Sequence, residues 1–397
     1  MTVGRSTVLG AAIAALLGSL AVWIVSAVSP LMRDEVGLTE ERLGLAVSVY
    51  FAVSALVSWL GGGLSDRIGA RRTLTLGAAC SVAAVLAIAL LAHSWIHIVL
   101  LLGVAGVGSA VIQPATNHAI VRGVRLSRHG LALGLKQASV PAATLLAGVS
   151  VPLLAVTFGW RWAFVLPAVV GLGFLPLRRH LPDGRRPKAR LGDASADGGG
   201  VGLPLLVLAV AGGVGVGAIS AATAFLVPYL VASGSTESTA GWILALASLA
   251  GVTMRVLSGW RADTLGTSSI PAIVTLLAVG SLGAAGLATE GGLVVLALAA
   301  MLMVGAGWGW NGLLVLTIVR AFPHTPGLAT GISQVGIRGG GAIGPSVFGL
   351  VAGGAGYTAG WTMVGAALAV AAVLMWVGGR LLPDPSAAPV PGAPDHA

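Results

Sequence analysis

Three cationic side chains stand inside long apolar stretches of the sequence: Lys136, Arg255 and Arg338. The 13 acidic residues, by contrast, fall in polar segments or at the ends of apolar stretches, so no carboxylate is available at the same depth to neutralise these charges. A buried cation without a partner is unfavourable unless it is hydrated or lines a cavity. A guanidinium also offers a planar fork of donors that matches a carboxylate or a similar oxyanion. The pattern therefore predicts an anion-binding site, with Arg338 as its main ligand.

Amide and aromatic residues recur in the same apolar stretches. Gln334 precedes Arg338 by four residues, and Gln113 precedes Asn117 by four, so each pair shares a helix face. Taken singly, each residue has a hydrogen bond between helices as its alternative role. Bracing a nearby loop is the alternative for Arg255, and reaching the membrane surface is the alternative for Lys136. The candidate substrate-binding residues are Arg338, Gln334, Arg255, Lys136, Gln137, Gln113, Asn117, Asn311, Trp310 and Tyr229.

Signatures of covalent chemistry are missing from the sequence. It contains neither the Gly-x-Ser-x-Gly motif of many hydrolases nor the glycine-rich Walker loop of ATP-driven proteins. Its single cysteine, Cys80, excludes an intramolecular disulfide and a cysteine-ligated zinc site. We therefore expect no catalytic residue, no metal ligand and no cofactor, and we predict that the protein is not an enzyme.

The elements that must position these residues are membrane helices. Hydrophobic residues make up 56 % of the 397-residue chain and only 9 % of its residues are charged, whereas soluble domains average about 25 % charged. Twelve helices of about 20 residues need about 240 residues, which this chain can supply. The predicted fold class is an all-α membrane protein with twelve transmembrane helices. The expected spans are residues 7–32, 42–64, 73–92, 98–121, 131–157, 160–177, 203–232, 240–260, 270–288, 292–319, 327–352 and 359–381.

The distribution of basic residues predicts the topology. Of the 22 Lys and Arg residues, 16 fall in loops that the twelve spans place on one side, three (Arg33, Arg42 and Arg161) fall on the other side, and three lie within spans. Such an excess marks the cytoplasmic side of a membrane protein. We therefore expect a multi-pass protein of the cytoplasmic (inner) membrane with both termini in the cytoplasm. The net charge of +9 is explained by this rule, so no nucleic-acid partner is expected.

The two halves of the sequence repeat at an offset of 197 residues. Thr39-Glu40 returns as Thr236-Glu237, and Gly159-Trp160 returns as Gly356-Tyr357. Two bundles in the same orientation, with a site near mid-membrane between them, are typical of transporters. The expected organisation is an N-terminal six-helix bundle over residues 1–177, a cytoplasmic linker over 178–202, a C-terminal six-helix bundle over 203–382 and a disordered tail over 383–397.

A glycine-rich basic loop between the second and third spans carries the clearest motif. It reads GGLSDRIGARR from Gly62 to Arg72, and a weaker copy, GWRADTLG, begins at Gly259. The carboxylate of Asp66 can meet the positive end of a neighbouring helix or pair with the arginines that follow it. The loop resembles the signature loop of the major facilitator superfamily, with Ala70 where a basic residue is usual.

The resemblance to this superfamily covers nearly the whole chain, through the helix count, the linker and the repeat. It implies the major facilitator fold and a loop that latches the two bundles in the outward-open state. It also implies a cavity lined mainly by spans one, four, seven and ten. The gating residues implied are Gly62, Asp66, Arg67, Gly69, Arg71, Gly259 and Asp263.

Together these features predict a secondary transporter that moves a small solute, with a small organic or inorganic anion as the expected substrate. The segments QPATN, GLKQASVP and GWGWNG loosely resemble anion-type members of the superfamily. The expected partners are the substrate, the lipid bilayer and, as one alternative for coupling, a co-transported proton. An efflux carrier for neutral or lipophilic compounds is the first alternative function. A non-transporting sensor is the second, disfavoured because the linker is too short for an output domain.

Overall fold

The structure is a computed structural model that describes residues 3–125, 129–183, 202–265, 269–322 and 325–382. Within these ranges the regular secondary structure is helical throughout. Twelve helical segments are long and apolar enough to cross a membrane, which confirms the predicted fold class. Part of the expected linker, residues 184–201, and the expected tail, residues 383–397, lie outside the described residues.

The first half of the chain supplies six of these segments. Its helices are α1 (Val3–Val36), α2 (Glu40–Ile68), α3 (Ala70–Leu91), α4 (Trp95–Gly123), α5 (His129–Gln137), α6 (Ser139–Ser150), a π-helical turn (Val151–Ala155), α7 (Val156–Phe158), a 3₁₀ turn (Trp160–Phe164) and α8 (Val165–Arg178).

The second half supplies the other six. Its helices are α9 (Leu203–Ala232), α10 (Glu237–Leu265), α11 (Ile270–Leu287), α12 (Leu293–Gly309), α13 (Asn311–Ala321), α14 (Pro326–Ala355) and α15 (Tyr357–Arg380).

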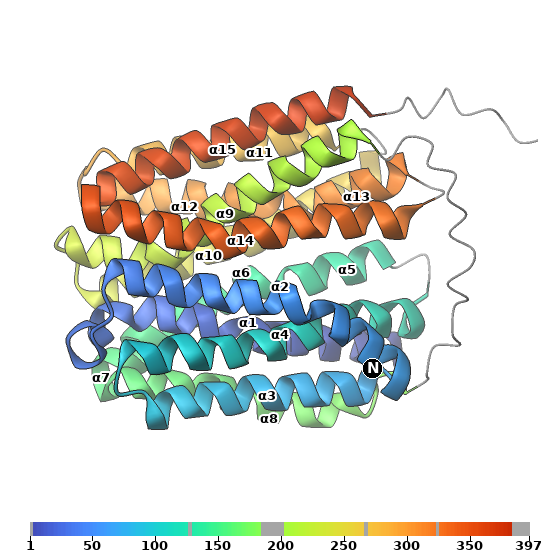
Figure 1. Ribbon diagram of the computed structural model, residues 1–397, viewed down its shortest axis with the longest axis horizontal. Coiled ribbons are helices and arrows are strands. Elements are labelled where there is room, and N and C mark those ends of the chain that lie inside the picture. The colour runs from blue at the N-terminus through green and yellow to red at the C-terminus, as the bar shows by residue number, and fades with distance from the viewer. Residues whose placement is uncertain (1–2, 126–128, 184–201, 266–268, 323–324, 383–397) are drawn as a thin grey trace, which may run out of the picture.

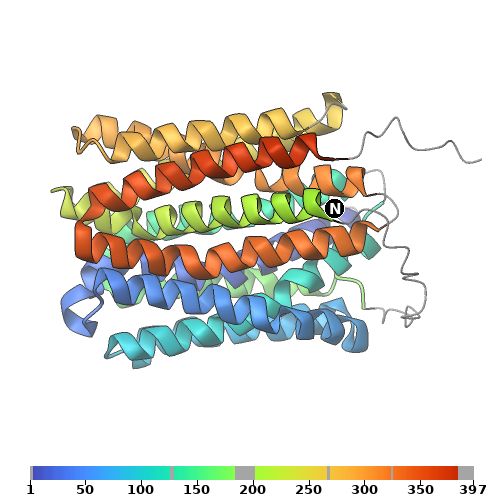
Figure 2. The same ribbon diagram turned by 45° about the horizontal axis from the view of Figure 1, so that its top comes forward.

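The helices form two bundles that lie side by side with their axes along the long dimension of the molecule (Figures 1 and 2). The N-terminal half, blue to green, makes one bundle, and the C-terminal half, yellow-green to red, makes the other. The end of α8, the start of α9 and the end of α15 lie at one end of the molecule, which also carries the arginines of the signature-like loop. We call it the basic end, and we call the other one the opposite end.

Close packing in each bundle depends on small residues. Along α14, Gly340 lies so near α9 that a Cβ atom built on it would stand 1.8 Å from the carbonyl oxygen of Gly213. Such contact between backbones gives membrane helices attractive dispersion where lipid supplies no hydrophobic drive. The glycine-rich stretch 340–349 therefore packs α14 closely against neighbouring helices.

Two of the expected spans are interrupted within their length, the fifth in its first half and the tenth in its second half. The fifth span breaks at Ala138, between α5 and α6, and the tenth breaks at Trp310, between α12 and α13. Each break releases backbone carbonyls that a continuous helix would pair. Within a membrane such groups need partners from the protein, and both breaks prove to lie beside the cations described next.

Candidate functional site

The three cations of the apolar stretches come together between the bundles. Lys136 lies in the last turn of α5 of the N-terminal bundle, whereas Arg255 on α10 and Arg338 on α14 belong to the C-terminal bundle. Lys136 lies within electrostatic reach of both guanidinium groups. Lys136 is 5 % exposed and Arg255 is 7 % exposed. Among the described residues, none of the three pairs with a carboxylate, so their positive charge is balanced by no acidic side chain there.

Lys136 is held by one of the predicted amides. Its Nζ atom donates to Oε1 of Gln113, on α4, at 2.7 Å. Gln113 is partly buried, and Asn117, one turn further along α4, is exposed. An amide oxygen orients the ammonium group without cancelling its charge. The Lys136 ammonium therefore keeps its attraction for an anion.

Arg255 is engaged by two backbone carbonyls. Its Nε atom donates to the carbonyl oxygen of Trp308 at 2.6 Å, and its Nη1 atom donates to the carbonyl oxygen of Gln137. The guanidinium carbon also lies 5.5 Å from the centre of the Trp308 ring. Gln137, one of the predicted site residues, thus takes part through its backbone.

Arg338 has the most freely available donors of the three. Its Nη1 atom donates to the backbone and hydroxyl oxygens of Ser54, on α2, at 3.2 and 3.4 Å. Its Nε and Nη2 atoms bond to no other described residue, and the side chain is only partly buried. Gln334, one turn earlier on α14, is also partly buried. Two donors on one planar fork suit an oxyanion with two oxygens.

An aromatic wall stands beside the cations. The rings of Trp23 and Trp308 meet edge to face at 6.0 Å, and Phe51 lies 6.1 Å from Trp23. The Trp308 indole donates to the hydroxyl of Thr223 at 3.1 Å, which fixes its orientation. The sequence analysis singled out neither Phe51 nor Ser54 as a site residue, because nothing in the local sequence distinguishes them from other lining residues.

Other predicted substrate contacts lie apart from the cations or point elsewhere. Tyr229 donates to the Leu287 carbonyl at 2.5 Å, and its ring centre lies 5.5 Å from that of Tyr357, near the opposite end. Trp310 is fully buried at the break between α12 and α13, with its ring against Gly215. Asn311, the next residue, is partly buried. The positions of Tyr229 and Trp310 indicate packing between helices.

Comparison with known proteins decides the family. The sequence profile of the Major Facilitator Superfamily matches residues 11–345. The chain belongs to the major facilitator superfamily. Solved members share its fold: the D-xylose–proton symporter superimposes with a TM-score of 0.78 over 96 % of this chain and 98 % of its own, at 17 % identity. A bacterial homologue of the human lysosomal transporter Spinster superimposes with a TM-score of 0.72 over 94 % and 96 %, also at 17 % identity.

Three curated transporters are similar in sequence. The probable sulfoacetate transporter SauU of Cupriavidus necator is 30 % identical over 151 residues, which cover 38 % of this chain and 35 % of that relative. The hexuronate transporter of Bacillus subtilis is 27 % identical over 37 % of this chain and 35 % of its own length. Monocarboxylate transporter 11 of Mus musculus is 28 % identical over 76 % of this chain and 70 % of its own. The first two matches thus span about a third of the relatives' length.

The loop that resembles the superfamily's signature loop joins α2 to α3 at the basic end. Gly69 ends α2 with a φ of 86°, a conformation that favours glycine. Arg71 pairs with Asp183 at 3.3 Å and donates to the carbonyl oxygens of Leu181 and Arg179, so it binds the end of α8 and not Asp66. Asp66 and Arg67 are exposed. In this conformation, therefore, Arg71 anchors the loop within its own bundle.

The remaining predicted gating residues are described only in part. Gly62 and Asp263 lie in α2 and α10, but their side-chain surroundings fall outside the described structure. A Cβ atom built on Gly259, in α10, would meet no atom within 4 Å, and the same holds for Gly134 and Gly331 on α5 and α14. The structure thus leaves open space beside these helices toward the basic end.

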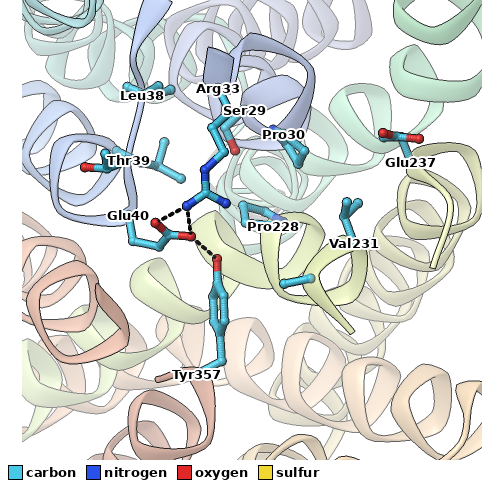
Figure 3. Close-up of a pocket in the computed structure, with 12 residues that line it drawn as sticks. Ser29, Pro30, Arg33, Leu38, Thr39, Glu40, Pro228, Val231, Glu237 and Tyr357 are labelled. Atoms are coloured by element: carbon cyan, nitrogen blue, oxygen red, sulfur yellow. Dashed lines mark hydrogen bonds and ion pairs between the residues drawn. The ribbon is translucent and has the colours of Figure 1, made fainter. Parts of the chain in front are cut away.

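The bundles meet at the opposite end around Glu40, the first residue of α2. Its carboxylate pairs with Arg33 of α1 and accepts a hydrogen bond from the Tyr357 hydroxyl of α15 at 3.1 Å. Figure 3 shows both side chains pointing at this carboxylate, beside a cavity of about 140 Å³ that residues of both bundles line. Deeper in, the Ser346 amide donates to the Ser48 hydroxyl at 3.0 Å. Direct hydrogen bonds thus join the two bundles at this end.

Proposed function

We propose that this secondary transporter carries a small organic or inorganic anion by alternating access. The observation that carries the proposal is the convergence of Lys136, Arg255 and Arg338 without a carboxylate partner among the described residues. Uncompensated charge inside a membrane protein is unfavourable until water or a ligand of opposite sign balances it. An anion between the bundles would supply that balance.

The names of the relatives support the same substrate class. Sulfoacetate, hexuronates and monocarboxylates, which appear in those names, are all small organic anions. In our proposal Arg338 contacts the anion directly through its free donors, and Lys136 faces the anion from the other bundle. Gln113, Gln334 and Asn117 hydrogen-bond the rest of the solute.

For orientation, we propose that the basic end faces the cytoplasm, in a cytoplasmic membrane. The excess of arginine and lysine at that end supports the assignment. The conformation is then inward-open, since the bundles are bonded to each other at the opposite end and Asp66 is exposed at the basic end. We also propose the domain limits expected from the sequence, with the N-terminal bundle ending after α8 and the linker on the cytoplasmic side.

Uptake into proteoliposomes tests the proposed substrate class. Sulfoacetate, glucuronate, lactate and nitrate would be offered with and without a pH gradient, beside xylose as a neutral solute and ethidium as a lipophilic cation. We expect saturable transport of at least one anion and none of xylose or ethidium. Transport of ethidium without any anion would instead support the efflux alternative.

A further inference from the structure

We infer that Arg255 is a positioning residue that joins two interrupted helices, one from each bundle, beside the anion site. The contacts behind this inference involve protein atoms alone, so they hold whatever the solute is. Only the consequence for anion binding rests on the proposed function.

The first acceptor of Arg255 is a carbonyl that its own helix cannot pair. In a continuous α-helix the carbonyl of Gln137 would accept from the amide four residues later. That residue is Pro141, which has no N–H group. The fifth span breaks at this point, between α5 and α6. The Nη1 atom of Arg255 supplies the missing donor.

The second acceptor lies at the other break. Trp308 is the penultimate residue of α12, and the last carbonyls of a helix have no partner within that helix. The Nε atom of Arg255 donates to the Trp308 carbonyl at 2.6 Å, and the indole ring packs against the guanidinium. One side chain therefore compensates two backbone interruptions at a depth where the bilayer offers no donor.

Arg255 and Arg338 differ in the backbone groups that their donors serve. Arg338 donates to Ser54 through one nitrogen at 3.2 and 3.4 Å. The Ser54 carbonyl is not deprived of its helical donor by a proline, because the residue four positions later is Ser58. Removing Arg255 would leave two carbonyls without donors, whereas removing Arg338 would mainly remove an uncompensated charge. The two arginines should therefore have opposite effects on the stability of the protein without solute.

The hydrogen bond from Arg255 to the Gln137 carbonyl also fixes the position of Lys136. Gln137, the acceptor, is its direct neighbour at the end of α5, and Lys136 reaches Gln113 only while this turn keeps its place. Arg255 thus holds a cation of the N-terminal bundle against the C-terminal bundle. Under the proposed function, this sets the spacing between Lys136 and Arg338, the two groups that face the anion.

Pro141 provides a direct test, because Pro141→Ala restores an amide to the position that Gln137 needs. The experiment uses the purified full-length chain in detergent, without solute, as wild type, Arg255→Gln, Arg255→Lys, Pro141→Ala, Arg338→Gln and the double variant Pro141→Ala/Arg255→Gln. One readout is the apparent melting temperature. The other is the rate at which Lys136 reacts with an amine reagent, measured by mass spectrometry against Lys188, the only other lysine in the sequence.

We expect Arg255→Gln to lower the melting temperature by about 5 °C or more and to speed labelling of Lys136 about fivefold or more. Arg255→Lys should be intermediate, because one ammonium cannot copy the fork that serves both carbonyls. Pro141→Ala should recover part of both effects in the double variant. Arg338→Gln should leave the melting temperature unchanged or raise it.

The inference is overturned if Arg255→Gln melts at or above the wild-type temperature with unchanged labelling of Lys136. It is equally overturned if Pro141→Ala recovers neither quantity in the double variant. If Arg255→Gln yields no folded protein, recovery of folded protein by Pro141→Ala supports the inference and failure to recover it counts against it. Loss of anion transport plays no part in these outcomes, so failure of the proposed function would be seen separately.

Discussion

The hydroxyl of Tyr357 lies 3.1 Å from Oε1 of Glu40 and joins the first residue of α15 to the first residue of α2. Within the repeat, Tyr357 corresponds to Trp160, whose indole donates to Glu35 at 2.6 Å inside the N-terminal bundle. Equivalent positions thus bond a carboxylate in both halves, but only the Tyr357 bond crosses between the bundles. It must break whenever the opposite end opens.

We therefore predict that Tyr357→Phe opens the opposite end more often. A hydrogen bond to a charged group contributes about 1.5–3 kcal/mol, so the open population should rise about tenfold. The measurement is labelling of Ser48→Cys, which is buried between the bundles, by an impermeant maleimide in a Cys80→Ser background. Tyr229→Phe is the matched control, since its hydroxyl bonds within its own bundle. Equal labelling in both tyrosine variants would show that the Tyr357–Glu40 hydrogen bond does not hold the opposite end closed.

Asp66→Asn tests the signature loop. Because Asp66 is exposed in this conformation, its charge is not needed for the anion site as described. If it latches the basic end in the other conformation, the substitution should slow exchange about tenfold and leave affinity largely intact. Counterflow rates in proteoliposomes, compared with equilibrium binding of the same anion, separate the two quantities. A weakened affinity with a normal rate would exclude the gating role.

Gln113→Glu tests whether the charge of Lys136 attracts the solute. The new carboxylate would stand where the amide oxygen now lies, 2.7 Å from the ammonium nitrogen. This carboxylate of the protein would neutralise the Lys136 charge, so the affinity for the anion should fall about tenfold or more. Gln113→Leu, which removes the hydrogen bond without adding charge, should have a smaller effect. The role of Lys136 is refuted if the Glu variant binds the anion as tightly as the Leu variant does.

Topology can be tested at position 188 of the linker. The charge distribution predicts that this segment lies in the cytoplasm. In a Cys80→Ser background, Lys188→Cys should resist an impermeant maleimide in intact cells and react only after the membrane is permeabilised. Labelling in intact cells would reverse the assigned orientation, and with it the description of the conformation as inward-open.

Much of the fold could be predicted because its determinants are local or repetitive. Hydropathy alone located all twelve spans, and the offset of 197 residues revealed the two halves. The ends were less certain, as α1 continues to Val36 beyond its expected end at residue 32. Positive φ at Gly69 also gives a physical reason for one glycine of the signature loop.

The partners of the cations could not be predicted. Arg255 bonds two backbone carbonyls, and a carbonyl is present at every residue, so the sequence does not show which ones are free. Pro141, four residues after Gln137, was the one available signal, since it deprives that carbonyl of its donor. No comparable proline in the sequence signals the break at Trp310. The hydrogen bond between Glu40 and Tyr357 joins the two bundles, so it depends on how the bundles pack and not on the local sequence.

The central claim, that an anion binds between the bundles on Arg338, is tested most directly by counterflow of sulfoacetate, glucuronate, lactate and nitrate into proteoliposomes carrying wild type, Arg338→Lys or Arg338→Gln. We predict that wild type transports at least one of these anions. Arg338→Lys should bind it more weakly, since an ammonium keeps the charge but not the fork, and Arg338→Gln should lose about 30-fold or more in affinity. Wild-type transport by Arg338→Gln, or transport of a cation in place of any anion, would contradict the account.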